Sequence, residues 1–404
     1  MPLSRAWFLC GLMFLASALS FLDRQVLSVL APVLTAEFSM SNAVYSRVVF
    51  AFVLSYTVMF TVGGRLMDRL GTRLGLAFSV GLWSLASAAH GWVAGPWGLG
   101  IARFFLGAGE GACFPAAAKG VVEWMPEERR ALAMGVATGG SAFGAVMAPP
   151  LTAWGAALFG WRGAFMATAL LGLLWLLAWQ AAFHGRSEGR ETVALRETSR
   201  IRELIAQAEV RRLLLARFFF DPVFYFYMFW IPQYLSWERG LDLAEIGALS
   251  WIPFFVLGLV QIAGGRLSDR LVSGGWEPRR ARIALMLLAA MLTPASWLAT
   301  RASTAGLAIG LMSVLMLAHG IWISNFMTLI GDLVPSRDVG TVVGLTGTCG
   351  GAAGMISNLL IGPVADGYSF VPVFAATAIL YPLAWLILAG RPGLAVLFGK
   401  GANR

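Results

Sequence analysis

The chain has 404 residues, of which 58% are hydrophobic and only 13% are charged, whereas soluble domains are about 45–50% apolar and about 25% charged. This composition excludes a soluble globular fold, because one aqueous core cannot bury so many apolar side chains. The net charge of +9 does not indicate nucleic-acid binding, since most of the arginines lie in short loops between apolar segments.

Twelve apolar segments are each long enough to cross a bilayer as a helix of about 20 residues. The first begins after Arg5 and contains Ala16–Ala18, a pattern that a cleaved signal peptide also shows. Its apolar run continues to Leu34, so we expect it to be kept as the first span. The predicted spans are 7–31, 43–65, 74–93, 97–121, 130–158, 163–183, 213–236, 244–266, 281–299, 303–331, 340–362 and 371–390.

The distribution of basic residues sets the orientation of these spans. Of the 30 Lys and Arg residues, 23 lie in one set of loops and ends and four in the opposite set. Basic loops stay in the cytoplasm. Both termini are therefore predicted to be cytoplasmic.

The one long polar segment, His184–Arg212, separates the sixth and seventh spans. Its part from Leu195 to Ala208 has the pattern of an amphipathic surface helix. We predict an all-α membrane protein with two pseudo-symmetric six-helix bundles at 1–184 and 213–404, joined by a cytoplasmic linker at 185–212.

An internal repeat supports this duplication. The octapeptide Gly63–Leu70 returns almost unchanged as Gly264–Leu271, after 201 residues. Each copy ends an apolar span and begins a basic turn, as a duplicated helix bundle would leave behind.

The two halves, the central linker and the repeated G-R-L-x-D-R resemble the major facilitator superfamily. In that family the motif acts as a conformational latch, which the resemblance assigns here to Gly64, Asp68, Arg69, Arg73, Gly265, Asp269 and Arg270. Further segments resemble its anion:cation symporter branch, and within it the bacterial hexuronate transporters of the inner membrane. These segments are Leu22–Leu27, Ala102–Gly107 with Glu110, Phe114–Ala117, Glu123–Pro126, Trp161–Phe165, Phe220–Pro222, Phe229–Leu235 and Asn358–Gly362. Helix five lacks the G-P-x-x-G-G element of proton-coupled antiporters, which favours symport.

Four ionisable residues stand out inside the predicted spans of the N-terminal half, because a charge there costs several kcal/mol and marks a functional site. Asp23 and Arg24 are in the first span, and Arg103 and Glu110 in the fourth. We expect Asp23 to face Arg103, which leaves Arg24 free toward a polar cavity.

Desolvation raises the pKa of a carboxyl group and a nearby arginine lowers it, so moving an arginine switches proton affinity. We therefore predict that Asp23, Glu110 and Arg103 handle the coupled proton and that Arg24 binds the substrate carboxylate through its planar fork. The resemblance to the symporter branch supports the proton role of the two acids. The alternative is a permanent ion-pair network that only joins helices one and four. Undiminished proton-driven uptake by a Glu110→Gln variant would contradict the proton role.

Neutral side chains on cavity-facing helices are the candidates for binding sugar hydroxyls, although each is also typical of helix packing. They are Tyr56, Tyr227, Gln261, His319, Trp322, Asn325 and Asn358. Trp322 has the ring type that stacks on a pyranose.

These features predict a non-enzymatic, proton-coupled importer of sugar-acid anions, with hexuronates as the first choice, that works by alternating access. The alternatives are another organic anion (an aldonate, aldarate or aromatic acid) and a membrane sensor that has lost transport. The expected partners are a small organic anion, a proton and the lipid bilayer, with no nucleic acid, cofactor or metal. Cys10, Cys113 and Cys349 lack disulfide or metal spacing, and the glycine-rich segments lack a P-loop ending. We expect a monomer.

Overall fold

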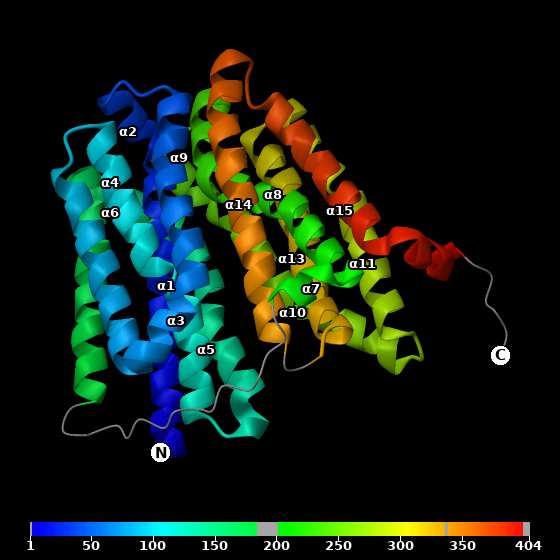
Figure 1. Ribbon diagram of the computed structural model, residues 1–404. Coiled ribbons are helices and arrows are strands. Elements are labelled where there is room, and N and C mark those ends of the chain that lie inside the picture. Colours follow the sequence, from blue (N-terminus) through cyan, green and yellow to red (C-terminus); the bar gives the residue numbers. More distant parts are fainter. Residues whose placement is uncertain (1, 184–200, 336–337, 399–404) are drawn as a thin grey trace. The chain divides into compact units, whose positions relative to one another are not determined.

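The computed structural model describes residues 2–183, 201–335 and 338–398 (Figure 1). All regular structure in these ranges is helical, which confirms the predicted all-α class. Eight helical elements precede the first gap. They are α1 (Leu3–Val29), α2 (Ala31–Glu37), α3 (Asn42–Ala89), η1 (His90–Trp92), α4 (Pro96–Glu110), α5 (Cys113–Trp124), η2 (Glu127–Arg129) and α6 (Arg130–Ala182).

Ten helical elements follow that gap. They are α7 (Ile201–Ala206), α8 (Ala208–Arg239), α9 (Leu243–Leu249), α10 (Trp251–Ser273), α11 (Pro278–Leu292), α12 (Pro294–Leu298), η3 (Ala299–Arg301), α13 (Ala305–Leu333), α14 (Val339–Gly367) and α15 (Val371–Phe398). The short helix α7 falls within the predicted amphipathic segment, whose first part, 195–200, lies outside the described residues.

Ten described segments are long and apolar enough to cross a membrane, and two local features reconcile this number with twelve spans. The segment Leu132–Ala182 contains two predicted spans, which meet at Gly160. The φ of 69° at Gly160 lies in the left-handed region that glycine adopts without strain. The fourth predicted span is divided into α4 and α5, of 15 and 12 residues, and each is too short to count alone. The twelve-helix fold follows.

The division of the fourth span has a cause in the sequence. Pro115 has no N–H to donate to the carbonyl of Gly111, four residues earlier, so the helical hydrogen-bond ladder is interrupted there. The helix α4 consequently ends at Glu110, one of the four charged residues predicted inside the membrane. This ionisable group therefore lies at a break in its helix.

Small residues bring α1 and α6 into close contact. A Cβ atom on Gly140 would overlap the carbonyl oxygen of Phe14, and one on Gly144 would overlap that of Ala18. Glycines at this four-residue spacing let two membrane helices approach at backbone distance. The glycine-rich segment is thus a packing surface.

Residue contacts divide the chain into two compact units. The first comprises the described parts of Met1–Ala194 together with Met228–Trp251 and Asn358–Asp366. The second comprises those of Leu195–Tyr227, Ile252–Ser357 and Gly367–Arg404. The division into bundles at 1–184 and 213–404 stays a prediction, and each unit is described by itself below.

The first unit holds the start of α3 against the ends of α8 and α14. Asp366 accepts hydrogen bonds from the backbone N–H groups of Asn42, at 3.0 Å, and Ala43, at 2.8 Å. A carboxylate at this position satisfies N–H groups that a helix start leaves free and complements the helix dipole. The Tyr45 hydroxyl donates to the carbonyl of Phe229, at 2.9 Å. These contacts close the end of the unit at which α3 begins.

Candidate functional site

A buried ion pair joins α1 to α4 in the first unit. The Oε2 atom of Glu110 accepts hydrogen bonds from Arg24 Nε (3.2 Å) and Nη2 (3.0 Å), and from the hydroxyl of Ser20 (3.0 Å). The side chains of Arg24 and Glu110 are only 4% and 0% exposed. Removing one member of such a pair leaves a buried charge uncompensated. Any change of charge on Glu110 must therefore change what Arg24 binds.

Three aromatic rings surround the guanidinium of Arg24. Its Cζ atom lies 4.5 Å from the ring centroid of Phe21, 5.2 Å from that of Phe52 and 4.4 Å from that of Tyr56. Aromatic faces attract a cation within about 6 Å, more strongly where water is excluded. Tyr56 thus lies beside Arg24, as expected of a residue at one site, while its contact with a substrate stays a prediction. The rings keep Arg24 in place when its anionic partner changes.

The expectation that Arg24 is left free is wrong, because Arg24 pairs with Glu110. Asp23 Oδ1 accepts a hydrogen bond from Ser87 Oγ at 2.8 Å, and within the described ranges no ion pair joins it to Arg103. Arg103 Nη1 donates instead to the backbone carbonyl of Arg24, at 3.2 Å. Residue spacing gives directions around one helix, but the rotation of α1 against α4 decides which acid meets which arginine. Glu110 of α4 pairs with Arg24 of α1.

Several charged atoms of this cluster keep unused hydrogen-bonding capacity. Among the described residues, Asp23 Oδ2, Glu110 Oε1, and Arg103 Nε and Nη2 are buried without a hydrogen-bond partner. Buried polar atoms are nearly always paired, so unpaired ones deserve a functional explanation. Acceptor oxygens on two acids and donor nitrogens on an arginine suit the uptake of a proton and the binding of an anion.

The position of Glu110 depends on two glycines, one in α4 and one directly after it. A Cβ atom on Gly107 would overlap the backbone of Phe52, and one on Gly111 would meet the carbonyl of Tyr56 at 2.6 Å. Both contacts are with α3, so the two helices pack at backbone distance next to Glu110. The same approach brings Phe52 and Tyr56 to Arg24.

The second unit contains most of the neutral candidates, and the structure gives several of them protein partners. The Tyr227 hydroxyl lies 2.6 Å from Ser296 Oγ. His319 is stacked on Phe224, with ring centroids 4.9 Å apart, and its Nδ1 is hydrogen-bonded to the Tyr381 hydroxyl. These contacts favour a helix-packing role for Tyr227 and His319.

Trp322 and Asn325 differ, since each retains an unused polar atom. Trp322 is fully buried, and neither its Nε1 nor Asn325 Oδ1 has a hydrogen-bond partner in the described part of the chain. The two residues lie three apart on α13, on one face of that helix. They are the stronger sugar-binding candidates of this unit. Gln261 is half-buried on α10.

Asn358 lies on α14 and belongs to the first unit, whereas the neutral candidates on α8, α10 and α13 belong to the second. Its Oδ1 accepts a hydrogen bond from Trp230 Nε1 at 2.8 Å, and the residue is fully buried. This bond joins α14 to α8. A contact of Asn358 with substrate stays a prediction.

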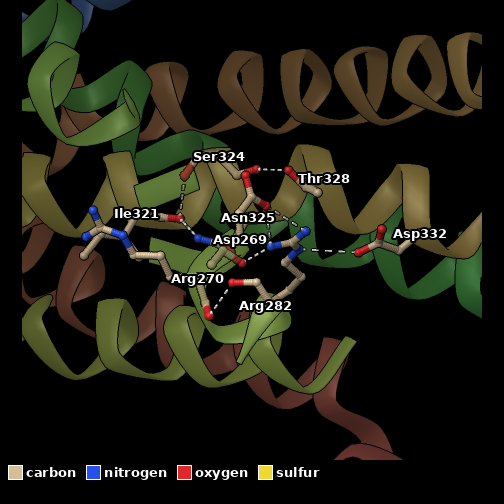
Figure 2. A network of polar contacts seen from close by, with 10 residues as sticks. Asp269, Arg270, Arg282, Ile321, Ser324, Asn325, Thr328 and Asp332 are labelled. Atoms are coloured by element: carbon tan, nitrogen blue, oxygen red, sulfur yellow. Dashed lines mark hydrogen bonds and ion pairs between the residues drawn. The ribbon is translucent and has the colours of Figure 1, made fainter. Parts of the chain in front are cut away.

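The second copy of the repeat forms a charge network that extends beyond the motif (Figure 2). Arg282 Nη1 lies 3.3 Å from Asp269 Oδ1, and Arg282 Nε lies 3.5 Å from Asp332 Oδ2. The Arg282 side chain is only 7% exposed, whereas Asp269 is 74% exposed. Arg282 therefore connects α10, α11 and α13. Sequence reasoning missed this arginine as a site residue, although an arginine one position inside a predicted span was a signal for it.

The first copy is held differently. Arg73 lies over the ring of Phe183, with its Cζ 5.2 Å from the centroid, and its carbonyl accepts a hydrogen bond from Trp179 at 3.0 Å. Arg69 is exposed, and the side chain of Asp68 lies outside the described part of the structure. Gly64 lies on α3 and Gly265 on α10, within their predicted spans, whereas Arg270 lies on α10 because that helix continues beyond the predicted span to Ser273. The latch role of these residues stays a prediction.

Residues 13–358 match the Major Facilitator Superfamily. The chain belongs to this superfamily. It is 29% identical to the hexuronate transporter of Escherichia coli K12, over 96% of this chain and 95% of that protein. It is 25% identical to the D-galactonate transporter of Escherichia coli O6:H1, over 96% of each. Its fold resembles the crystal structure of a D-xylose–proton symporter with a TM-score of 0.74, at 15% identity, over 94% of this chain and 96% of that one. The protein is a membrane transporter and not an enzyme.

Proposed function

We propose that the chain imports sugar-acid anions together with protons and that its substrates are hexuronates. The transporter works by alternating access in the bacterial inner membrane, and both of its termini lie in the cytoplasm. The observation that carries this proposal is the buried pair of Arg24 and Glu110, which places an anion-binding group against a proton-binding group. Transport of hexuronates by a relative that aligns over nearly the whole chain supports the substrate class.

Competition for Arg24 explains how the two cargoes are coupled. While Glu110 is ionised it occupies both Nε and Nη2 of Arg24, so a substrate carboxylate finds no free fork. A proton on Glu110 removes the negative charge and weakens both bonds. Arg24 then binds the substrate carboxylate in a bidentate manner. Anion binding thereby requires proton uptake.

Arg103 and Asp23 support this exchange. Arg103 donates to the carbonyl of Arg24 and retains two unused donor nitrogens. Asp23 is held by Ser87, which in turn contacts Thr168 Oγ1 at 3.0 Å. We assign Asp23 a second proton-binding role, in which its ionisation balances the charge of Arg103. The unused Oδ2 of Asp23 is the atom available for this proton.

Uptake into proteoliposomes tests the proposal. Labelled glucuronate, galacturonate, galactonate and a neutral hexose are each offered with and without an inward proton gradient. We expect the two hexuronates to accumulate only with the gradient, and the neutral hexose not to enter. Movement of the neutral sugar alone would overturn the substrate class, and accumulation of hexuronate that ignores the gradient would overturn proton coupling.

One alternative substrate has its own support. A full-length relative carries D-galactonate, an aldonate. The guanidinium group of Arg24 recognises the carboxylate that hexuronates and aldonates share, so it does not discriminate between these two substrate classes. In the same panel, accumulation of galactonate but not of the hexuronates would assign the chain to the aldonates.

A further inference from the structure

An apolar groove runs along the first unit between α1 and the two segments of α6. Its volume is about 490 Å³, and all thirteen residues that line it are apolar. Leu12, Leu15 and Leu19 of α1 contribute, as do Phe143 and Leu174 of α6. The single indole N–H in the lining, that of Trp175, is used by the carbonyl of Leu12 at 2.7 Å. The groove therefore offers no polar group to a sugar acid.

The groove has the length of one lipid leaflet. On α1 its lining extends from Leu12 to Leu22, and ten residues of helix correspond to about 15 Å. Half of a hydrocarbon core of about 30 Å is also about 15 Å. Leu15, Phe143 and Leu174 are about half exposed, so the groove is open along one side. One extended acyl chain fits these dimensions.

Two arginines lie beyond one end of the groove. Trp175, in the groove wall, stacks on Trp179 with centroids 5.0 Å apart, and Trp179 contacts Phe183 at 5.1 Å. Arg5 and Arg73 both lie over the Phe183 ring, with Cζ atoms 5.5 Å and 5.2 Å from its centroid. This row of rings leads from the apolar wall to two positive charges.

Arg5 lies in line with the groove on both of its walls. It precedes Leu12 by two helical turns on α1, and its Nη2 donates to the carbonyl of Ala182 at 2.9 Å. Ala182 is one turn beyond Ala178, the last lining residue of α6. Within the described ranges Arg5 forms no ion pair with a carboxylate. Its charge remains available to an anion from outside the chain.

We propose that this groove binds one acyl chain of an anionic phospholipid and that Arg5 and Arg73 bind the phosphate of its headgroup. An apolar channel of leaflet length that ends at two guanidinium groups has the layout of such an amphiphile. Basic residues between membrane helices on the cytoplasmic side recognise anionic headgroups. The positive-inside rule assigns this end to the cytoplasmic leaflet.

Native mass spectrometry of the purified full-length protein tests the site, with phosphatidylglycerol and phosphatidylcholine added separately after delipidation. Wild type is expected to retain one phosphatidylglycerol. Ala178→Trp fills the groove and should abolish retention. The Arg5→Gln/Arg73→Gln double variant should weaken it about 30-fold, because each basic side chain contributes about fivefold near an anionic headgroup.

Matched controls separate the site from general effects. Leu177→Trp adds the same ring at an exposed position outside the groove, and Arg47→Gln removes an exposed charge elsewhere. Both should retain the lipid as wild type does. Thermal unfolding of every variant identifies any that are misfolded. Equal retention of phosphatidylcholine would overturn the headgroup assignment, and undiminished retention by a folded Ala178→Trp variant would overturn the groove.

Discussion

Replacing Glu110 by glutamine removes the charge that holds Arg24 while keeping the size of the side chain. In the proposed mechanism the neutral amide imitates the protonated carboxyl group. Wild type should bind hexuronate well at acidic pH and progressively less well as rising pH ionises Glu110 and returns Arg24 to it. The Glu110→Gln variant should bind well at every pH, and it should fail to couple binding to proton uptake.

The size of the effect follows from the bonds that the substrate must replace. Arg24 donates to Glu110 through Nε and Nη2, at 3.2 Å and 3.0 Å. A hydrogen bond to a charged group contributes about 1.5–3 kcal/mol net. Glutamine still offers one neutral acceptor, so we expect the substitution to relieve about one such bond. An advantage of about 1.5–3 kcal/mol corresponds to about 10- to about 150-fold tighter binding at alkaline pH.

Isothermal titration calorimetry of glucuronate against the detergent-solubilised protein, from acidic to alkaline pH, measures this effect. Glu123→Gln is the matched control, because Glu123 pairs with Lys119 at 3.8 Å and is partly exposed. Arg24→Gln should lose binding at every pH, with or without Glu110→Gln. If Glu110→Gln binds more weakly than wild type at all pH values while remaining folded, the pair only joins α1 to α4 and the competition mechanism is wrong.

Three further substitutions test the fold by thermal unfolding in detergent. Gly140→Val should destabilise the protein by about 1–3 kcal/mol or more, because the valine side chain would meet the Phe14 carbonyl. Gly135→Val should cost less, because open space surrounds Gly135. Equal losses of stability in the two variants would contradict the close packing of α1 on α6. Arg282→Gln should cost about 1–3 kcal/mol by breaking the contacts to Asp269 and Asp332, and the exposed Arg280→Gln should not. Tyr45→Phe should cost about 0.5–1.5 kcal/mol through the lost bond to Phe229, and Tyr368→Phe, 83% exposed, should be neutral.

The fold could be predicted because membrane spans follow from length and hydrophobicity, which act locally along the chain. The repeated octapeptide then indicated the duplication. Local chemistry also explains the two departures, since Pro115 divides the fourth span and Gly160 turns the chain inside a double-length helix. Neither feature changes the number of crossings.

The charged residues of the candidate site could be identified from the sequence, but their pairing could not. A charge inside a span is unusual enough to identify Asp23, Arg24, Arg103 and Glu110 from sequence. Which acid meets which arginine depends on how α1 and α4 are rotated against each other, and that rotation is fixed only when the helices pack together. The Ser20 and Ser87 hydroxyls went unnoticed for a related reason, since serine in a membrane helix is common and becomes informative only beside a carboxylate.

The repeat connects the proposed site to the proposed latch in each half. A Cβ atom on Gly63, the first residue of the first copy, would lie 3.1 Å from the Cα of Ala112, two residues after Glu110. A Cβ atom on Gly264, the first residue of the second copy, would lie 3.1 Å from the Cα of Ile321, next to Trp322. The first-copy helix thus packs at backbone distance on the turn directly after Glu110, and the second-copy helix packs on α13, which carries Trp322. If protonation of Glu110 moves the backbone at Ala112, we expect α3 to move near Gly63 as well, because backbone contacts this close leave no compressible side chain between them.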